Sequence, residues 1–256
     1  MEASNNEWNA QEPENQQGKK PAKKEKKERP WYLEVLSVVV LALVLVFVVQ
    51  NFIGRVYVIP SASMEPTLHG CTGCEGDRIF VNKMSYRFGS PKDGDVVVFK
   101  DPDSWESDYQ SIRSTNPVVR GLQNVGSFIG IVAPDEKDLV KRVMATGGET
   151  IRCLPGDAGI TVNGEVRSAD YTLNPTQYPI DPLTGSEACG GAYFGPITVP
   201  EGHVFVMGDN RTNSADSRYH LDDENQGTVP VENIVGKVNA VVWPLNRWHS
   251  VGNPYS

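Results

Sequence analysis

The sequence has little positive charge for its length. Its 256 residues include 24 Lys and Arg against 32 Asp and Glu, which gives a net charge of −8 at pH 7 and a pI near 5.1. A general nucleic-acid-binding protein needs a basic surface to neutralise phosphates, so this balance argues against a nucleic-acid partner. With 22% charged and 9% aromatic residues the chain is neither collagen-like nor wholly disordered, and its 24 Gly and 18 Pro indicate many turns, as in β-rich proteins.

Several common patterns are missing as well. The sequence has no internal repeat, and no amphipathic helix of convincing length is expected after residue 53. No serine lies in a G-x-S-x-G elbow, and no lysine stands three residues after Ser61 or Ser63. The patterns of an α/β-hydrolase and of a class A β-lactamase or penicillin-binding protein are therefore absent.

One long apolar segment lies near the N-terminus. The run from Val35 to Val49 contains a single polar residue, Ser37, and the apolar character continues to Ile53. As a helix, the 19 residues from Val35 to Ile53 would span about 30 Å, the thickness of the hydrocarbon core of a membrane. Because a buried core helix is rarely apolar on every face, we predict a single transmembrane helix over residues 31–53.

The charges before this segment predict its orientation. Residues 1–30 hold seven Lys and Arg, all between Lys19 and Arg29. By the positive-inside rule, residues 1–30 form a disordered cytoplasmic tail, and the chain after Ile53 lies outside the plasma membrane. A cleaved secretory signal also begins with a basic stretch, but no clear small-x-small site follows the run, so we favour a retained anchor.

Cysteine is scarce, and all four cysteines follow the predicted span. An oxidising compartment favours disulfides, and four cysteines allow three connectivities, of which Cys71 with Cys74 and Cys153 with Cys189 is the simplest. Cys71 and Cys74 also have the spacing of zinc ligands, but no second close pair completes a four-cysteine site. No βαβ pattern surrounds them, as it would in a thioredoxin-like redox site. We therefore predict disulfides and no metal site.

The chain after residue 53 is predicted to be mainly β. Asn163-Gly164 lies between two short apolar segments and is a strong signal for a two-residue β-hairpin. Short runs rich in β-branched residues recur between Gly, Pro, Asn and Asp, as expected for antiparallel strands. These runs are Val56–Ile59, Ile79–Val81, Val96–Phe99, Leu139–Ala145, Ile160–Val162, Val204–Met207 and Val238–Trp243.

These runs predict an extracytoplasmic antiparallel β-sheet domain. Its core is expected over residues 54–150 and 200–245. Residues 101–136 and 167–196 are dense in Pro, Gly, Ser, Asn and Asp. We therefore predict 101–136 to be a loop-rich insertion in the core and 151–199 to be a minor β-ribbon domain rich in loops. Residues 246–256 are a C-terminal tail.

Two serines lie close to the predicted membrane surface. Ser61 and Ser63 belong to the stretch P-S-A-S-M-E-P-T-L at 60–68, and Ser63 stands ten residues after Ile53. At about 3.3 Å per residue, the chain keeps Ser63 within roughly 33 Å of the span. Taken alone this stretch is an ordinary Ser-Pro turn, and a serine nucleophile would still need a base.

Besides four histidines, Lys141 is a candidate for that base. It lies in a predicted strand whose alternation puts it on one face with Leu139 and Val143, and puts Arg142 on the other face. If the face of Lys141 is the core face, burial lowers the pKa of the lysine, and the neutral amine can accept a serine proton. If that face is exposed, Lys141 is a solvated strand charge, which is the commoner environment of lysine.

A polar loop follows another apolar strand. Residues 208–218 read G-D-N-R-T-N-S-A-D-S-R. Loops of this composition often build tight turns through side-chain hydrogen bonds, so the loop by itself does not indicate a site.

Taken together, these segments resemble the sequence boxes of bacterial type I signal peptidases, which are membrane-anchored serine–lysine endopeptidases. The P-S-x-S-M-x-P-T-L stretch is followed by G-D-x-x-x-V-N-K at 76–83, K-R-V-x-A-x-x-G-E at 141–149 and G-D-N-R-x-x-S-x-D-S-R at 208–218. The boxes stand in the family's order after an N-terminal anchor, and the resemblance covers about residues 31–245. Four boxes in order are far more specific than any one of them.

The resemblance implies a role for each site residue. Ser63 is the nucleophile and Lys141 the general base. Ser61 helps to form the oxyanion hole with the backbone N–H of Ser63, and Ser214 orients the lysine. The residues expected to support the loop around them are Asp209, Asp216 and Arg218. The scheme uses no cofactor and no metal.

The resemblance also implies the substrate. The enzyme would cleave signal peptides from secreted preproteins at the outer face of the plasma membrane, after small residues in an Ala-x-Ala-like pattern, through an acyl-enzyme. Its partners would be preprotein signal peptides, membrane lipid and, functionally, the secretion translocon. Two other functions remain open: an anchored β domain that binds a partner without catalysis, and a Ser/Lys protease that cuts itself or a regulatory protein.

Overall fold

The computed structural model describes residues 30–71, 74–105, 114–128 and 138–255. Its first element is helix α1, Trp31–Val48, which continues into a π-helical turn, Val49–Ile53. The helix covers the range predicted for the span, and its 23 residues are apolar and long enough to cross a membrane. The predicted cytoplasmic tail lies outside the described residues, except for Pro30. The chain divides into two compact units, one ending at Val40 and the other beginning at Leu41.

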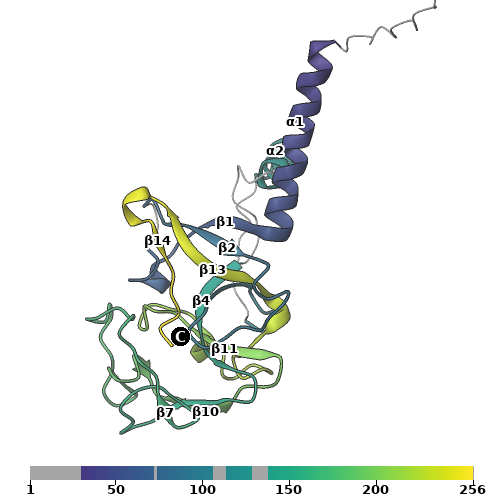
Figure 1. The fold of residues 1–256 in the computed structure, drawn as a ribbon. Helices are drawn as coiled ribbons and strands as arrows, with labels where there is room; N and C mark the ends of the chain where they lie inside the picture. Colours follow the sequence, from purple (N-terminus) through teal and green to yellow (C-terminus); the bar gives the residue numbers. More distant parts are fainter. Residues whose placement is uncertain (1–29, 72–73, 106–113, 129–137, 256) are drawn as a thin grey trace, which may run out of the picture. The chain divides into compact units, whose positions relative to one another are not determined.

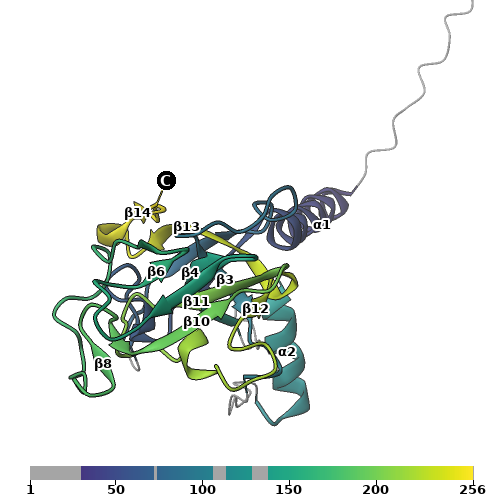
Figure 2. The same ribbon diagram turned by 90° about the horizontal axis from the view of Figure 1, so that it is seen from below.

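Most strands belong to one eight-stranded antiparallel sheet. Seven of them follow the order β1-β2-β13-β3-β4-β11-β12, and β14 pairs with β13. Their bounds are β1 Gly54–Val58, β2 Arg78–Asn82, β3 Val96–Lys100, β4 Asp138–Thr146, β11 His203–Met207, β12 Val229–Pro230, β13 Ile234–Trp243 and β14 His249–Ser250. The sheet is strongly curled (Figure 1), and β3, β4 and β11 lie side by side in it (Figure 2).

Two smaller sheets lie between β4 and β11 in the sequence. A four-stranded sheet has the order β10-β5-β6-β7, and two further strands form a separate pair. The bounds are β5 Thr150–Cys153, β6 Thr161–Val162, β7 Glu165–Val166, β8 Gly185–Ser186, β9 Gly191–Ala192 and β10 Phe194–Thr198. The Asn163-Gly164 hairpin is confirmed: both residues have positive φ, 53° and 86°, as a two-residue turn between β6 and β7 requires.

Strand β4 is buried on both faces, which determines the environment of Lys141. Its residue Val143 packs in a cluster with Val97 of β3, whereas the next residue, Met144, packs in a different cluster with Phe205 of β11. The curl of the large sheet and the packing of the four-stranded sheet therefore leave no solvent-exposed face at the centre of this strand.

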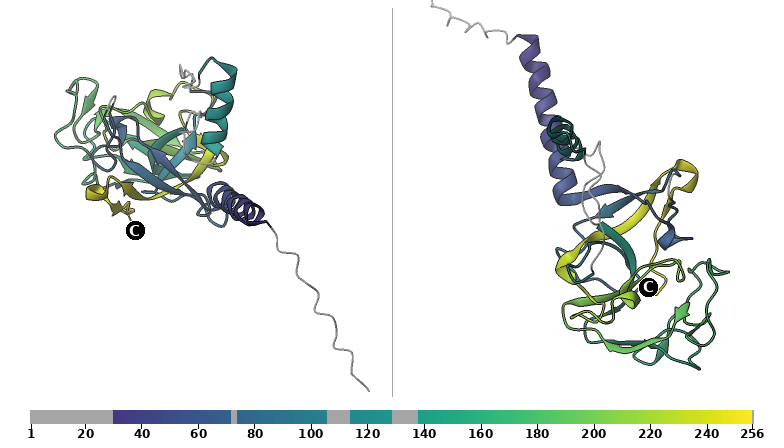
Figure 3. Two further views of the ribbon diagram at one scale, coloured as in Figure 1. Left: turned by 90° about the horizontal axis from the view of Figure 1, so that it is seen from above. Right: turned by 180° about the vertical axis from the view of Figure 1, so that it is seen from behind.

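One helix was not expected from the sequence. Helix α2, Pro117–Phe128, lies inside the segment that we predict to be loop-rich, so the prediction of no amphipathic helix after the span is wrong. The helix begins with a cap, because Asn116 Oδ1 accepts a hydrogen bond from the backbone N–H of Val118 at 3.0 Å and proline occupies the first helical position. It lies outside the sheets (Figure 3), and Leu122 is 69% exposed.

Short 3-10 turns complete the structure: η2 Ala62–Met64, η3 Ser217–Tyr219, η4 Val231–Asn233 and η5 Leu245–Arg247. The predicted class, a mainly β protein with an antiparallel sheet after one N-terminal apolar helix, is confirmed. The predicted division into a core, a minor domain and a C-terminal tail stays a prediction.

Candidate active site

Ser63 lies in the 3-10 turn η2. This turn begins directly after Ser61, whose backbone is extended. The turn is anchored from below, because Met64 and Leu68 are fully buried in the cluster that also contains Ile59. The anchoring leaves Ser63 half-buried at the surface of the core, with Ser61 Oγ 3.3 Å from Ser63 Oγ. We call residues 61–64 the Ser63 turn.

Lys141 lies in the middle of β4 and is 4% exposed. Its neighbour across the sheet is Val97 of β3. Its Nζ lies 2.9 Å from Ser63 Oγ and donates a hydrogen bond to the carbonyl of Val140 at 3.1 Å. The structure therefore brings the predicted nucleophile and the predicted base into direct contact, although they lie 78 positions apart in the sequence.

Burial controls the protonation of this lysine. Loss of solvation disfavours the ammonium form and lowers the pKa of Lys141 to about 8; the nearby carboxylates of Asp216 and Asp209 oppose the shift, and the Arg218 guanidinium adds to it. With such a pKa about a tenth of the molecules carry a neutral Lys141 at pH 7, far more than for an exposed lysine, and the neutral amine is the form that a general base requires.

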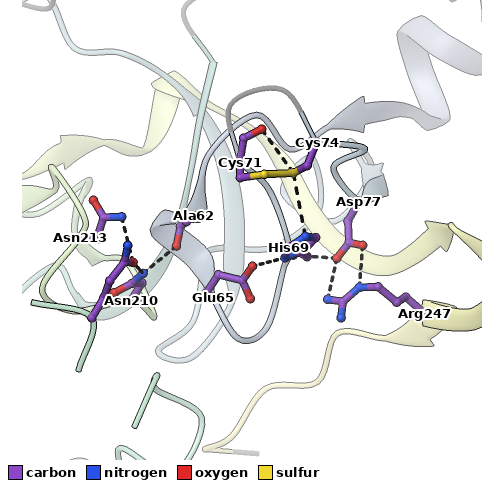
Figure 4. Close-up of polar contacts among 10 residues, drawn as sticks. Ala62, Glu65, His69, Cys71, Cys74, Asp77, Asn210, Asn213 and Arg247 are labelled. Atoms are coloured by element: carbon purple, nitrogen blue, oxygen red, sulfur yellow. Dashed lines mark hydrogen bonds and ion pairs between the residues drawn. A yellow bond between two sulfur atoms is a disulfide. The ribbon is translucent and has the colours of Figure 1, made fainter. Parts of the chain in front are cut away.

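The polar loop holds the Ser63 turn through Asn210. The backbone N–H of Asn210 donates to the Ser63 carbonyl at 3.1 Å, and its side-chain amide donates to the Ala62 carbonyl at 3.0 Å. Figure 4 shows this amide between Ala62 and the side chain of Asn213. Both Asn210 and Asn213 donate to Gln177 Oε1, but only Asn210 reaches the Ser63 turn. Asn210 was not predicted as a site residue.

A glycine allows the polar loop to approach Ser63. A Cβ atom on Gly208 would lie well under 3.0 Å from both the Ser63 carbonyl oxygen and the Ser214 hydroxyl, which is closer than real Cβ contacts. The backbone at Gly208 must therefore stay without a side chain for the loop and the turn to pack as they do.

Asp209 forms a buried ion pair with the residue next to the lysine. Arg142 Nε and Nη2 donate to the two Asp209 oxygens at 2.9 and 2.7 Å, and Thr67 Oγ1 donates to the same carboxylate at 2.6 Å. Arg142 Nη1 donates to the carbonyl of Gly94 at 2.7 Å. The pair thus links the lysine strand, the polar loop and the segment after the Ser63 turn. Arg142 and Thr67 were not predicted as site residues, although both lie inside sequence boxes.

Asp216 and Arg218 form a second buried pair within the loop. Arg218 Nε and Nη2 donate to the Asp216 oxygens at 2.9 and 2.8 Å, and the backbone N–H of Gly208 donates to Asp216 at 3.0 Å. Burial alone would raise the pKa of the Asp216 carboxyl, but the Arg218 guanidinium keeps that pKa below its usual value. The pair therefore stays ionised and holds the loop in one conformation.

Ser214 lies near the dyad without bonding to it in this structure. The residue is 4% exposed, and its hydroxyl makes no hydrogen bond to Lys141 within the described chain. The role of orienting the lysine, which the resemblance implies, stays a prediction.

The four cysteines form two disulfides in the structure, Cys71–Cys74 and Cys153–Cys189. The second is fully buried in the cluster under the four-stranded sheet, whereas both residues of the first are exposed. The two bonds therefore differ in their access to solvent.

Comparisons with known proteins identify the family of this chain. The profile of the family described as "Signal peptidase, peptidase S26" matches residues 32–243. The chain is 51% identical over 241 residues to the probable signal peptidase I of Mycobacterium leprae (strain TN), an alignment that covers 90% of this chain and 82% of that protein. It is 55% identical over 220 residues to the signal peptidase I of Mycobacterium tuberculosis, covering 84% of this chain and 74% of that protein.

More distant relatives carry the same name. The chain is 31% identical over 222 residues to signal peptidase I T of Bacillus subtilis (strain 168), which covers 87% of this chain and 91% of that protein. The family profile matches most of the chain. The two Mycobacterium proteins are more than half identical to this chain over most of each sequence. This chain therefore belongs to the signal peptidase family, peptidase S26, as a serine peptidase of the bacterial signal peptidase I type.

Proposed function

We propose that this chain removes signal peptides from secreted preproteins with Ser63 as the nucleophile and Lys141 as the general base. The observation that carries the assignment is the 2.9 Å between Lys141 Nζ and Ser63 Oγ, combined with the burial of the lysine. Cleavage of signal peptides by a serine peptidase is the activity of the family. The identity of the two reacting side chains in this chain is the part that we propose.

The first half of the reaction forms an ester. Neutral Lys141 takes the hydroxyl proton of Ser63 while Ser63 Oγ bonds to the scissile carbonyl carbon, and the carbonyl electron pair moves to its oxygen. The Ser61 hydroxyl and the backbone N–H of Ser63 donate hydrogen bonds to this oxyanion. The carbon–nitrogen bond then breaks, and the Lys141 ammonium gives its proton to the leaving amine.

The second half releases the product and restores the dyad. Lys141, again neutral, takes a proton from water, and the resulting hydroxide attacks the ester carbon. Ser63 Oγ leaves and recovers its proton from Lys141, so the enzyme ends in its starting state. The only groups that gain and lose protons on the enzyme are the two residues of the dyad.

The substrate preference that we propose is a cleavage site with small residues in an Ala-x-Ala-like pattern. The family membership supports this preference. The substrate would be presented at the outer face of the plasma membrane, because the basic cluster before α1 favours a cytoplasmic N-terminus. Functional association with the secretion translocon would deliver the preproteins.

Membrane lipid is a second proposed partner of the β domain. Strand β1 follows the apolar helix and exposes Val56 and Val58, which are 49% and 52% exposed, on one face. Leu245 and Trp248, in and directly after turn η5, are 72% and 71% exposed. Large apolar side chains that remain exposed in a folded domain are suited to contact with a membrane. A fragment lacking residues 1–53 should therefore still bind lipid vesicles, and a fully soluble fragment would contradict the proposal.

The decisive experiment is cleavage of a preprotein that carries an Ala-x-Ala site by the full chain in detergent. The new N-terminus is identified by mass spectrometry, and Ser63→Ala serves as the matched control. We expect cleavage directly after the last small residue, lost in the variant.

Two other results would contradict the proposal. Cleavage that persists in Ser63→Ala would show that another group is the nucleophile. No cleavage by a folded wild-type preparation would favour an anchored domain that binds without catalysis.

A further inference from the structure

The exposed disulfide Cys71–Cys74 lies in the loop that follows the Ser63 turn. Both cysteines are exposed, and they are separated by three positions in the sequence. Cys153 and Cys189, in contrast, are 0% exposed and lie in the core under the four-stranded sheet. A reductant in solution therefore has access to the first disulfide and not to the second while the protein stays folded.

Side chains connect this disulfide to the Ser63 turn. Glu65 terminates the turn, and its backbone N–H donates to the Ala62 carbonyl at 3.1 Å. The Glu65 carboxylate pairs with His69 Nδ1, and the other ring nitrogen, His69 Nε2, lies 3.9 Å from Cys74 Sγ. Figure 4 shows the series from Glu65 through His69 to the disulfide. A continuous set of contacts therefore leads from Cys74 to Glu65, which stands two positions after Ser63 in the sequence.

The backbone makes a second connection. Gly70, next to Cys71, packs so tightly that a Cβ atom on it would lie 2.6 Å from the Ile59 carbonyl oxygen and 2.7 Å from that of Ser61. The disulfide loop therefore lies against the segment that leads to Ser61 and Ser63. A change in the conformation of this loop would be transmitted to the position of both hydroxyls.

The base of the loop is held independently of the disulfide. Asp77 accepts a backbone hydrogen bond from Ile59 at 2.9 Å and donates one to the His69 carbonyl at 2.8 Å, and its carboxylate pairs with Arg247 at 2.8 and 3.0 Å. Loss of the disulfide would consequently release Cys71 and Cys74 from each other without unfolding the base of the loop.

We propose that Cys71–Cys74 is a thiol–disulfide exchange site and that its oxidised form holds the Ser63 turn in the geometry of the active enzyme. The effect on activity rests on the proposed Ser63/Lys141 function, but the exchange itself does not. The reactant is a dithiol from the compartment that the β domain faces. It reduces Cys71–Cys74 and is itself oxidised to a disulfide.

The exchange proceeds by two displacements. A thiol of the reagent loses its proton to water, and the thiolate attacks Cys71 Sγ, forms a mixed disulfide and expels Cys74 as a thiolate, which takes up a proton from water. The second thiol of the reagent then loses its proton and displaces Cys71, leaving the reagent as a disulfide. Two electrons and two protons pass to the protein, which ends with two thiols at Cys71 and Cys74.

The test uses the full chain in detergent and dithiothreitol as the probe. Aliquots taken along a reductant titration are alkylated, the modified cysteines are identified by mass spectrometry, and kcat/KM for preprotein cleavage is measured in parallel. We expect alkylation of Cys71 and Cys74 while Cys153 and Cys189 stay unmodified, with a fall in kcat/KM of at least about fivefold that follows the modification of the first pair. Removal of dithiothreitol and reoxidation with oxidised glutathione should restore the activity.

The variant Cys71→Ser with Cys74→Ser supplies the control. It should have the activity of the reduced wild type and should not respond to reductant. Reduction of Cys71–Cys74 with unchanged kcat/KM would overturn the coupling, and reduction of Cys153–Cys189 first would overturn the exchange site. An oxidised enzyme that does not cleave preprotein at all would contradict the proposed function instead, and the alkylation pattern would still decide the exchange.

Discussion

The proposed base, Lys141, and the proposed nucleophile, Ser63, are positioned in different ways. Lys141 lies in the middle of β4, where it pairs with Val97 of β3, and the pairing with β11 begins at the next residue, Arg142, so the sheet fixes its backbone. Ser63 lies in a three-residue turn. The buried side chain of Met64 anchors this turn, and the Asn210 amide donates a hydrogen bond to its Ala62 carbonyl. The chemistry of the lysine comes from burial in a regular sheet. The position of the serine depends on a few contacts, each of which one substitution can remove.

The largest effect is expected from changing the lysine itself. In Lys141→Arg the positive charge remains, but a guanidinium is not neutral at any usable pH and cannot accept the Ser63 proton. We expect kcat/KM for preprotein cleavage to fall by at least about a thousandfold. Retained activity in a folded variant, verified by circular dichroism, would remove Lys141 as the base.

The pH dependence of kcat/KM in the wild-type protein tests the role of Lys141 without a substitution. Because burial lowers the pKa of Lys141 to about 8 and the neutral form is the active one, activity is present above this pH and is lost below it. The plot of kcat/KM should level off about one unit above pH 8 and approach a tenfold fall per unit below it, roughly fiftyfold between pH 8 and 6. The substrate should carry no titrating group near the cleavage site. A midpoint near the ordinary lysine value, about 10.4, would show that the base is not desolvated.

The strands, including the one that carries Lys141, are the part of the structure that sequence patterns predicted well. Each of the seven apolar runs overlaps an observed strand, because alternation and β-branched content are local properties. Helix α2 was missed even though Asn116 and Pro117 form an ordinary helix start, because the glycines and polar residues around them suggested a loop. The capping signal was the better guide in this segment.

The contacts around the serine could not be predicted in the same way. The boxes that contain Ser63, Lys141 and the polar loop were recognised from their order in the sequence. The bonds that join them, from Asn210 to Ala62 and from Arg142 to Asp209, link residues 148 and 67 positions apart. Such pairings depend on how the sheet curls, and no local pattern specifies them.

A substitution on the loop side should displace the nucleophile while leaving the lysine strand unchanged. In Gly208→Ala the new methyl group would overlap the Ser63 carbonyl oxygen and the Ser214 hydroxyl, so the Ser63 turn must move away from the loop. A displacement of about 1 Å costs up to about a hundredfold in rate. We expect kcat to fall more than KM rises, with the midpoint of the pH profile unchanged because Lys141 keeps its burial. A shifted midpoint would show that the loop also controls the lysine.

Ser214→Ala offers a related test of the same loop. If the hydroxyl orients Lys141 during the reaction, kcat should fall while KM changes little, and a change confined to KM would contradict that role. Because Ser214 makes no hydrogen bond to Lys141 in the described structure, the expected loss is smaller than for Gly208→Ala.

The smallest effect, and the finest test of the comparison, comes from the two asparagines of the loop. Asn210→Ala removes the hydrogen bond to the Ala62 carbonyl, whereas Asn213→Ala removes only a bond to Gln177, which Asn210 also makes. One lost hydrogen bond corresponds to a change of up to about tenfold, so kcat/KM should fall about tenfold in Asn210→Ala and stay near the wild-type value in Asn213→Ala. Stability is measured alongside by urea unfolding, so that a general loss of structure is recognised. Equal losses in both variants would mean that the loop acts as a whole; a loss specific to Asn210→Ala would mean that a single amide on a loop sets the position of the serine, while the sheet alone sets that of the lysine.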